Sequence, residues 1–332
     1  MQSSLFKPTA TVLAAALAWP GIGAAYDLPA VNLGLTSFLD GGPPAGPGWY
    51  FSEYLNFYEG GKLKDGQGNS LILPTPNGFR EHEVDAFAAL SQLIYQSDTP
   101  VLAGGKWGIN AILPVVDPQV SPDDSLAIRA NGSGLGDILV GPFLQWDPIM
   151  GPQGPIFMHR VEFQFILPTG KYDSDHEVNP GSNFFSFSPY WAGTYFFRPD
   201  LTASWRLHYL WNATNEDPSS GTRAAIQMAH PDLRVEDLQA GQAVHLNFAA
   251  DYAVIPNQFR VGINGYWLKQ ITDSEADGQK LGDRTEQVFG IGPGAVWHMS
   301  KDTHLFANLY FETDAENRPE GTRLNLRLVH HF

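Results

Sequence analysis

Apolar and polar side chains alternate every two residues along much of the chain. In the segment 201–211, Trp205 and Leu207 fall on one face, whereas Arg206 and His208 fall on the other. Several other segments repeat this pattern, and helical periodicity is scarce. Because successive side chains of a β-strand point to opposite faces, the alternation predicts strands with one apolar and one polar face. The chain is therefore expected to be all-β.

About twelve segments fit the alternation, and the connections between them are of two kinds. Short turns rich in Pro, Asn, Asp and Gly are predicted at 97–99, 147–155, 198–199, 256–257 and 300–301, and longer connections separate most of these hairpins. The predicted strands lie near 49–59, 83–97, 100–115, 134–147, 156–167, 184–197, 200–214, 241–255, 258–273, 285–299, 302–314 and 320–332.

Tight turns at one end and long loops at the other are typical of a transmembrane antiparallel up-and-down β-barrel. A secreted β-sandwich is the competing architecture, because it also buries one face of each strand. The predicted strands are long for a sandwich. Tryptophans near the strand ends also favour the barrel, since they would form girdles at the membrane surfaces. These tryptophans are Trp49, Trp107, Trp146, Trp211, Trp267 and Trp297.

The last strand ends in an aromatic residue. Phe332 follows alternating Leu324, Leu326 and Leu328, with His330 as a departure from the apolar pattern. A terminal aromatic residue on such a strand is the usual targeting signature of bacterial outer-membrane barrels. We therefore expect the protein in the outer membrane of a Gram-negative bacterium.

The first 25 residues read as a secretory signal peptide. Lys7 precedes an apolar run at 11–23, and small residues stand before a predicted cleavage site at Tyr26. The following residues 26–48 are rich in Pro and Gly and form a candidate plug of the lumen. The predicted barrel then occupies 49–332.

Composition narrows the function. The net charge of −15 argues against nucleic acid as a partner, since phosphate binding needs a basic face. The absence of Cys removes disulfides, thiol catalysis and Cys-based metal sites. The acidic excess lies mostly in the long connections. These carboxylates are either solvated loop tips or ligands for divalent cations that bridge to lipopolysaccharide.

Polar faces of the predicted strands would line the lumen, because a charge facing lipid costs about 2–4 kcal/mol at the bilayer midplane for Arg or Lys. Two interpretations stay open: paired networks that brace the wall, or a polar constriction through which a solute passes. The lumen candidates are Lys106, Asn110, Arg160, Glu162, Gln164, Arg206, His208, His245, Asn247, Asp251, Arg260, Asn264, Tyr266, Asn308, Tyr310, Glu312, Arg323, Asn325 and Arg327.

Catalytic and metal motifs are weak. No His pair has a zincin spacing, and the Gly-rich runs are not followed by a helix, so neither a metal nor a cofactor is expected. Outer-membrane phospholipases are also barrels and use Ser and His. His208 or His304 could serve in such an enzyme, but neither has an evident Ser partner in the sequence. No catalytic residue is predicted.

Several Gly- and Pro-rich motifs follow one another along the chain: GLGDILVGP at 134–142, LPTGKYD at 167–173, NPGSN at 179–183, FSP at 187–189 and GIGPG at 290–294. In their order and spacing they resemble the outer-membrane channel family associated with the meta-cleavage pathway of phenol degradation. The resemblance implies a monomeric twelve-stranded barrel, surrounded by outer-membrane lipid and lipopolysaccharide, that passively admits small hydrophobic or aromatic molecules. Pro168, Gly170 and Asn183 are then expected to shape a loop. A lipid-modifying enzyme and a plugged structural or adhesive barrel are the alternatives.

Overall fold

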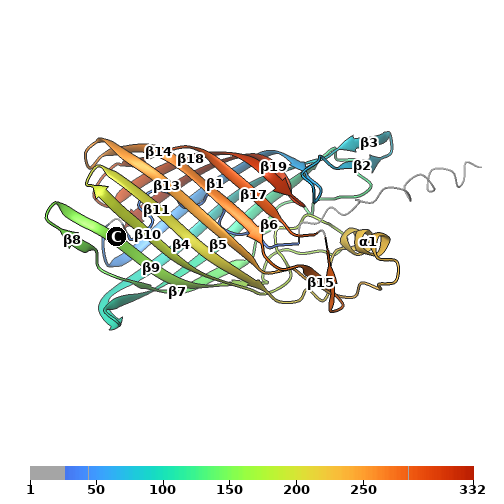
Figure 1. The fold of residues 1–332 in the computed structure, drawn as a ribbon, viewed down its shortest axis with the longest axis horizontal. Helices are drawn as coiled ribbons and strands as arrows, with labels where there is room; N and C mark the ends of the chain where they lie inside the picture. Colours follow the sequence, from blue (N-terminus) through green and yellow to red (C-terminus); the bar gives the residue numbers. More distant parts are fainter. Residues whose placement is uncertain (1–26, 44, 283) are drawn as a thin grey trace, which may run out of the picture.

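The computed structural model describes residues 27–43, 45–282 and 284–332 and shows a closed β-barrel (Figure 1). Within these residues, twelve long antiparallel strands each pair with their neighbours, and the last strand pairs with the first. The predicted fold is confirmed. The strands are β1 (Gly48–Leu63), β4 (Glu83–Leu102), β5 (Gly105–Ser121), β7 (Ile138–Gln145), β9 (Gly154–Leu167), β10 (Ser186–Arg198), β11 (Leu201–Asn212), β13 (Ala243–Ile255), β14 (Phe259–Gln270), β17 (Gln287–His298), β18 (Thr303–Glu316) and β19 (Pro319–His331).

Short elements decorate both ends of the barrel. At the end with long connections, a helix begins after Ser219, whose side chain accepts a hydrogen bond from the Thr222 N–H. No helix among the described residues is long and apolar enough to cross a membrane. The short elements are β2 (Ile72–Thr75), β3 (Gly78–Glu81), β6 (Gly134–Leu135), β8 (Ile149–Gly151), α1 (Ser220–Ala229), β12 (Leu238–Gln239), β15 (Ser274–Ala276) and β16 (Gln279–Leu281).

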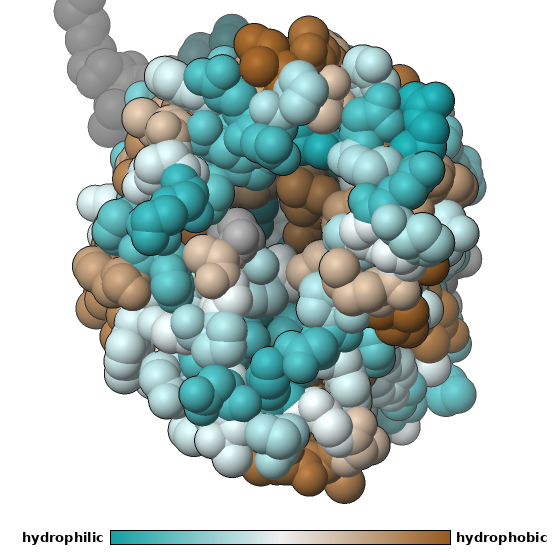
Figure 2. Space-filling view, turned by 90° about the vertical axis from the view of Figure 1, so that its left-hand side faces the viewer, coloured by the Kyte–Doolittle hydropathy of each residue, from teal (hydrophilic) through white to brown (hydrophobic). Residues whose placement is uncertain are grey.

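The two faces of the wall differ as the alternation predicts. On β11, Leu207 is exposed on the outer face, while Arg206 and His208 are buried inside the barrel. Trp49, Trp107 and Trp297 are exposed near the short-turn end, and Trp211 and Trp267 near the opposite end. Figure 2 looks onto the short-turn end, where hydrophilic residues gather over the rim and around a central hollow.

The turn between β4 and β5 lies further along the chain than predicted. The sequence placed it at 97–99, but both strands continue and the turn falls at Ala103 and Gly104, with φ of 49° and 79°. Positive φ at both central residues matches the right-handed twist of the strands in a tight hairpin. The predicted connection 147–155 likewise contains β8 and the start of β9. Both hairpins therefore extend beyond the predicted strand ends.

An irregular stretch runs through the inside of the barrel before β1 begins. We call the described residues 27–43 and 45–47 the N-terminal segment. Asp27 lies beside Arg284, in the connection between β16 and β17, whereas the Pro47 carbonyl accepts from the His331 ring nitrogen at the short-turn end. Phe38, between these points, is fully buried. The predicted signal peptide lies outside the described residues.

Candidate pore and cavity

The start of the N-terminal segment is anchored at the end with long connections. The Asp27 carboxylate accepts two hydrogen bonds from the Arg284 guanidinium, at 2.8 and 3.2 Å. Glu286 Oε1 accepts the backbone N–H groups of Asp27 and Leu28, each at 2.8 Å. Burial raises the pKa of Glu286 to about 7, although the Arg318 guanidinium acts in the opposite direction. The anchor therefore contains two buried carboxyl groups, Asp27 and Glu286.

The middle of the segment lies against the polar wall. The Gly34 N–H donates to Asn247 Oδ1 at 2.7 Å, and its carbonyl accepts from the Tyr310 hydroxyl at 2.9 Å and from Asn325 Nδ2 at 3.2 Å. A Cβ at Gly34 would lie 2.6 Å from the Tyr310 ring, and φ is +75°. Glycine is required here both for its backbone conformation and for this close approach.

Nearer the short-turn end of the barrel, the segment carries a buried ion pair. Asp40 accepts two hydrogen bonds from the Arg206 guanidinium, both at 2.7 Å, and that guanidinium stacks over the Tyr190 ring at 4.2 Å. The next residue, Gly41, donates its N–H to Thr194 Oγ1 at 2.8 Å. A bidentate pair of this kind fixes geometry as well as adding energy. The segment is therefore attached along its whole length to β10, β11, β13, β18 and β19.

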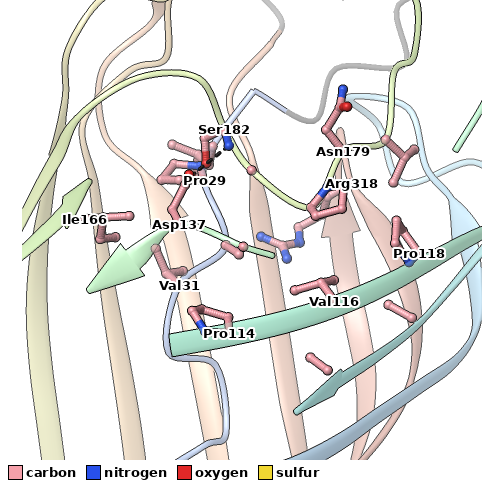
Figure 3. A pocket seen from close by; sticks show the side chains of 18 of the residues that line it. Pro29, Val31, Pro114, Val116, Pro118, Asp137, Ile166, Asn179, Ser182 and Arg318 are labelled. Carbon is pink, nitrogen blue, oxygen red and sulfur yellow. Dashed lines mark hydrogen bonds between the residues drawn. The ribbon is translucent and has the colours of Figure 1, made fainter. Parts of the chain in front are cut away.

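The part of the segment nearest the long connections, which we call its upper part, leaves a space on the side away from the strands that it contacts. A cavity of about 380 Å³ separates it from β4, β5 and β9. Figure 3 shows Pro29 and Val31 of the segment across from Pro114, Val116 and Pro118 of β5. Most side chains of β4 and β5 that line the cavity are apolar: Val84, Ala86, Ala88, Leu90, Ile112, Pro114, Val116 and Pro118.

Hydrogen-bonded polar side chains lie on the side of the cavity that faces the short-turn end. Gln92, which lines it, accepts from the Tyr54 hydroxyl at 2.9 Å and donates to Asn110 Oδ1 at 2.9 Å. Asn110 donates in turn to Glu162 Oε1 at 2.8 Å, and the Tyr190 hydroxyl donates to Glu162 Oε2 at 2.6 Å. This chain of hydrogen bonds joins side chains of β1, β4, β5, β9 and β10 and passes over β7, which lies between β5 and β9. On this side, an apolar molecule in the cavity would therefore meet polar groups that already have hydrogen-bond partners.

The lumen residues predicted from the sequence lie on inward-facing positions of the wall, and many are paired. Buried ion pairs join Arg260 with Asp251, and Arg206 with Asp40 of the segment. The rings of His208 and His245 stack with centroids 4.0 Å apart. These contacts support the interpretation that the polar network braces the wall. Gln164, Arg206 and Arg323 are among the predicted residues that line the cavity. A pore-lining role stays a prediction for the whole predicted set, including the residues that do not line the cavity: Lys106, Arg160, Glu162, His208, His245, Asp251, Arg260, Tyr266, Asn308, Tyr310, Glu312 and Arg327.

The apolar lining of the cavity was missed by the sequence analysis. On β4, the inward Ala86, Ala88 and Leu90 alternate with outward Phe87 and Ala89, so both faces are apolar. Near-continuous apolar strands are the signal of burial on both faces. That signal was present in the sequence at 84–90 and 111–116.

The candidate catalytic histidines lie inside the barrel. His208 Nδ1 is 3.2 Å from Ser188 Oγ, and both side chains are at most 2% exposed. His304 Nδ1 is 2.8 Å from His298 Nδ1. Neither pair lies on the outer wall, where a lipid would be reached. Among the described residues, no group of three or more His, Cys, Asp or Glu is placed to hold a metal ion.

The protein family described as "Putative MetA-pathway of phenol degradation" matches residues 60–328. The chain belongs to this family. The resemblance noted in the motifs is thereby confirmed over most of the chain. A comparison with curated proteins finds no match.

One solved outer-membrane channel has the same fold, and two others are similar to a lesser degree. The COG4313 outer membrane channel from Pseudomonas putida F1 is similar with a TM-score of 0.69 at 17% identity, covering 91% of this chain and 100% of that one. The toluene transporter TodX of Pseudomonas putida has a TM-score of 0.42 at 9% identity, covering 92% and 96% of the two chains. The CymD monoaromatic hydrocarbon channel has 0.37 at 9%, covering 93% and 94%. The likeness to the first of these confirms an outer-membrane barrel fold.

Proposed function

We propose that this protein is an outer-membrane channel for the passive uptake of small apolar or aromatic molecules. The observation that carries the proposal is the apolar cavity between β4, β5 and the N-terminal segment. The β4 and β5 wall of the cavity presents Ala, Leu, Ile, Val and Pro, and polar side chains such as Asn56 and Arg323 lie on other sides. A continuous apolar wall of this kind suits an apolar solute better than a hydrophilic one. The family's description names a pathway of phenol degradation, and the similar structure is described as an outer membrane channel.

The orientation follows from the connections. Long loops of such barrels face the outside and short turns face the periplasm, so the cavity lies in the outer half of the lumen. The N-terminal segment acts as a plug whose upper part forms one wall of the cavity. The exposed outer face contacts lipid as a monomer, and lipopolysaccharide surrounds the acidic long connections. Catalysis has no part in this function.

A pair of neighbouring alanines tests the proposal. Ala88 lines the cavity, whereas Ala89 occupies the next position and faces outward. Ala88→Phe is expected to slow the uptake of an apolar probe such as toluene into proteoliposomes, because the ring fills the cavity. Ala89→Phe should leave uptake at the wild-type rate. Equal rates for both variants, or no uptake above that of protein-free liposomes, would contradict the proposal.

A further inference from the structure

One side chain in the cavity has an unused hydrogen-bond donor. Asn56 of β1 lines the cavity and is 5% exposed. Its Oδ1 accepts from Arg323 Nη1 at 3.0 Å, which fixes the orientation of the amide. The Nδ2 group has no hydrogen-bond partner among the described residues. Because a buried donor without an acceptor is costly, this position suits a group supplied by a bound molecule.

The charges around Asn56 are already balanced. Glu312 accepts from the hydroxyls of Tyr58 and Tyr266 at 2.7 and 2.6 Å, and Arg323 Nη2 lies 3.8 Å from its carboxylate. One guanidinium thus faces one carboxylate. An anionic ligand would meet no excess positive charge here, and a cationic ligand no excess negative charge. An uncharged acceptor fits this environment.

The donor also borders the apolar wall. Asn56 is the cross-strand partner of Ala88 on β4, and Ala86 and Leu90 line the same cavity. A molecule lying on these side chains would bring one polar atom to the Asn56 amide. Other unpartnered amides, at Asn264 and Asn308, do not line the cavity within the described residues.

We propose that the cavity binds uncharged apolar molecules that carry one oxygen acceptor, such as a ketone or an alcohol, with Asn56 Nδ2 as the hydrogen-bond donor. This inference rests on the proposed channel function and adds a preference for oxygenated solutes over plain hydrocarbons. Asn56 is then the residue that determines this specificity.

Three ligands of similar size separate the contributions. Ethylbenzene has no polar atom, acetophenone only accepts hydrogen bonds, and 1-phenylethanol both accepts and donates. Binding to the full-length folded protein in detergent micelles is measured by calorimetry, with correction for partition into protein-free micelles. In the wild type, acetophenone and 1-phenylethanol are expected to bind about two- to tenfold more tightly than ethylbenzene, the ratio that one net hydrogen bond provides.

Two substitutions change the donor in different ways. Asn56→Asp keeps an oxygen for Arg323 but replaces the donor with an acceptor, so the preference for acetophenone should disappear while that for 1-phenylethanol remains. Asn56→Leu removes both groups, and all three ligands should then bind alike. Asn264→Leu is the matched control, and it should keep the wild-type ratios. Heat-modifiable migration on gels reports whether each variant is folded.

The outcomes distinguish the two proposals. If ethylbenzene binds but acetophenone binds no better, or if Asn56→Asp keeps the preference for acetophenone, the assignment of Asn56 is wrong and the channel function is unaffected. If none of the three ligands binds the wild type, the assignment and the proposed function are both overturned.

Discussion

The ion pair between Asp40 and Arg206 is the contact on which docking of the N-terminal segment most depends. The two side chains are 6% and 10% exposed, and the guanidinium donates two hydrogen bonds of 2.7 Å. Asp40→Ala would leave Arg206 buried beneath the segment without its carboxylate. Breaking a buried pair in this way costs about 3–5 kcal/mol. In the undocked state, water enters the lumen and solvates Arg206. The substitution therefore raises the free energy of the docked state and not that of the undocked state.

A cost of this size shifts the docking equilibrium by roughly 10²- to 5 × 10³-fold toward the undocked state. The protein contains no Cys, so a single cysteine reports the shift. Ser37 is 3% exposed and its hydroxyl has no partner among the described residues, which makes Ser37→Cys a mild replacement. The rate at which a small hydrophilic methanethiosulfonate labels this cysteine follows the undocked fraction.

The labelling rate is therefore expected to rise by about the same factor in Asp40→Ala, and single-channel conductance should increase. The exposed pair Arg198–Asp200 provides the control, with side chains 60% and 36% exposed. Because exposed pairs contribute only about 0–1 kcal/mol, Asp200→Ala should change the labelling rate by less than about fivefold. If Asp40→Ala labels no faster than Asp200→Ala, the pair does not hold the segment and the reasoning fails.

Two other predictions concern the same segment. The folded pKa of Glu286, about 7, is above the unfolded value near 4.5, so the folded state binds the extra proton between these values. Stability against urea should therefore fall by about 3 kcal/mol as pH rises through this window, and Glu286→Gln should remove that dependence; a wild type whose stability rises over this window would contradict it. At Gly294, a Cβ would lie 2.0 Å from Asn264 Oδ1 and 2.9 Å from the Phe38 ring. Gly294→Ala should speed labelling of the reporter cysteine, whereas Gly282→Ala, whose Cβ meets nothing within 4 Å, should not; equal rates in the two variants would rule out this contact as a determinant of docking.

Most strands could be predicted because each of them lies between two different environments. On β11, lipid on one side selects Leu207 and the lumen on the other selects Arg206, so the sequence itself shows the alternation. The end of a strand could not be predicted where its two faces meet the same environment. The hairpin at Ala103 and Gly104 extends beyond the barrel rim and carries exposed Val101 and Leu102, which resemble membrane-facing residues.

The cavity could not be derived in the same way. Alternation assigns one face of a strand to lipid. It does not reveal that an internal segment leaves a space beside the other face, where apolar side chains then line a cavity. The position of Asn56 shows this limit. Its inward direction follows from parity on β1, yet its unpartnered amide results from Arg323 on β19 and from the path of a segment that precedes both. Such contacts join parts of the chain that local patterns treat separately.

The path of the N-terminal segment has a consequence for assembly. The segment starts at the end with long connections and joins β1 at the opposite rim, inside a wall closed by pairing of β1 with β19. Once that seam has formed, the segment cannot leave sideways, and it can be withdrawn only lengthwise through the rim at which it joins β1. The segment must therefore either be enclosed as the seam closes or be threaded into a finished tube. In the first case the bonds of Gly34 and Asp40 form together with the seam, and the order of strand pairing decides whether the segment lies inside the barrel from the moment the barrel closes.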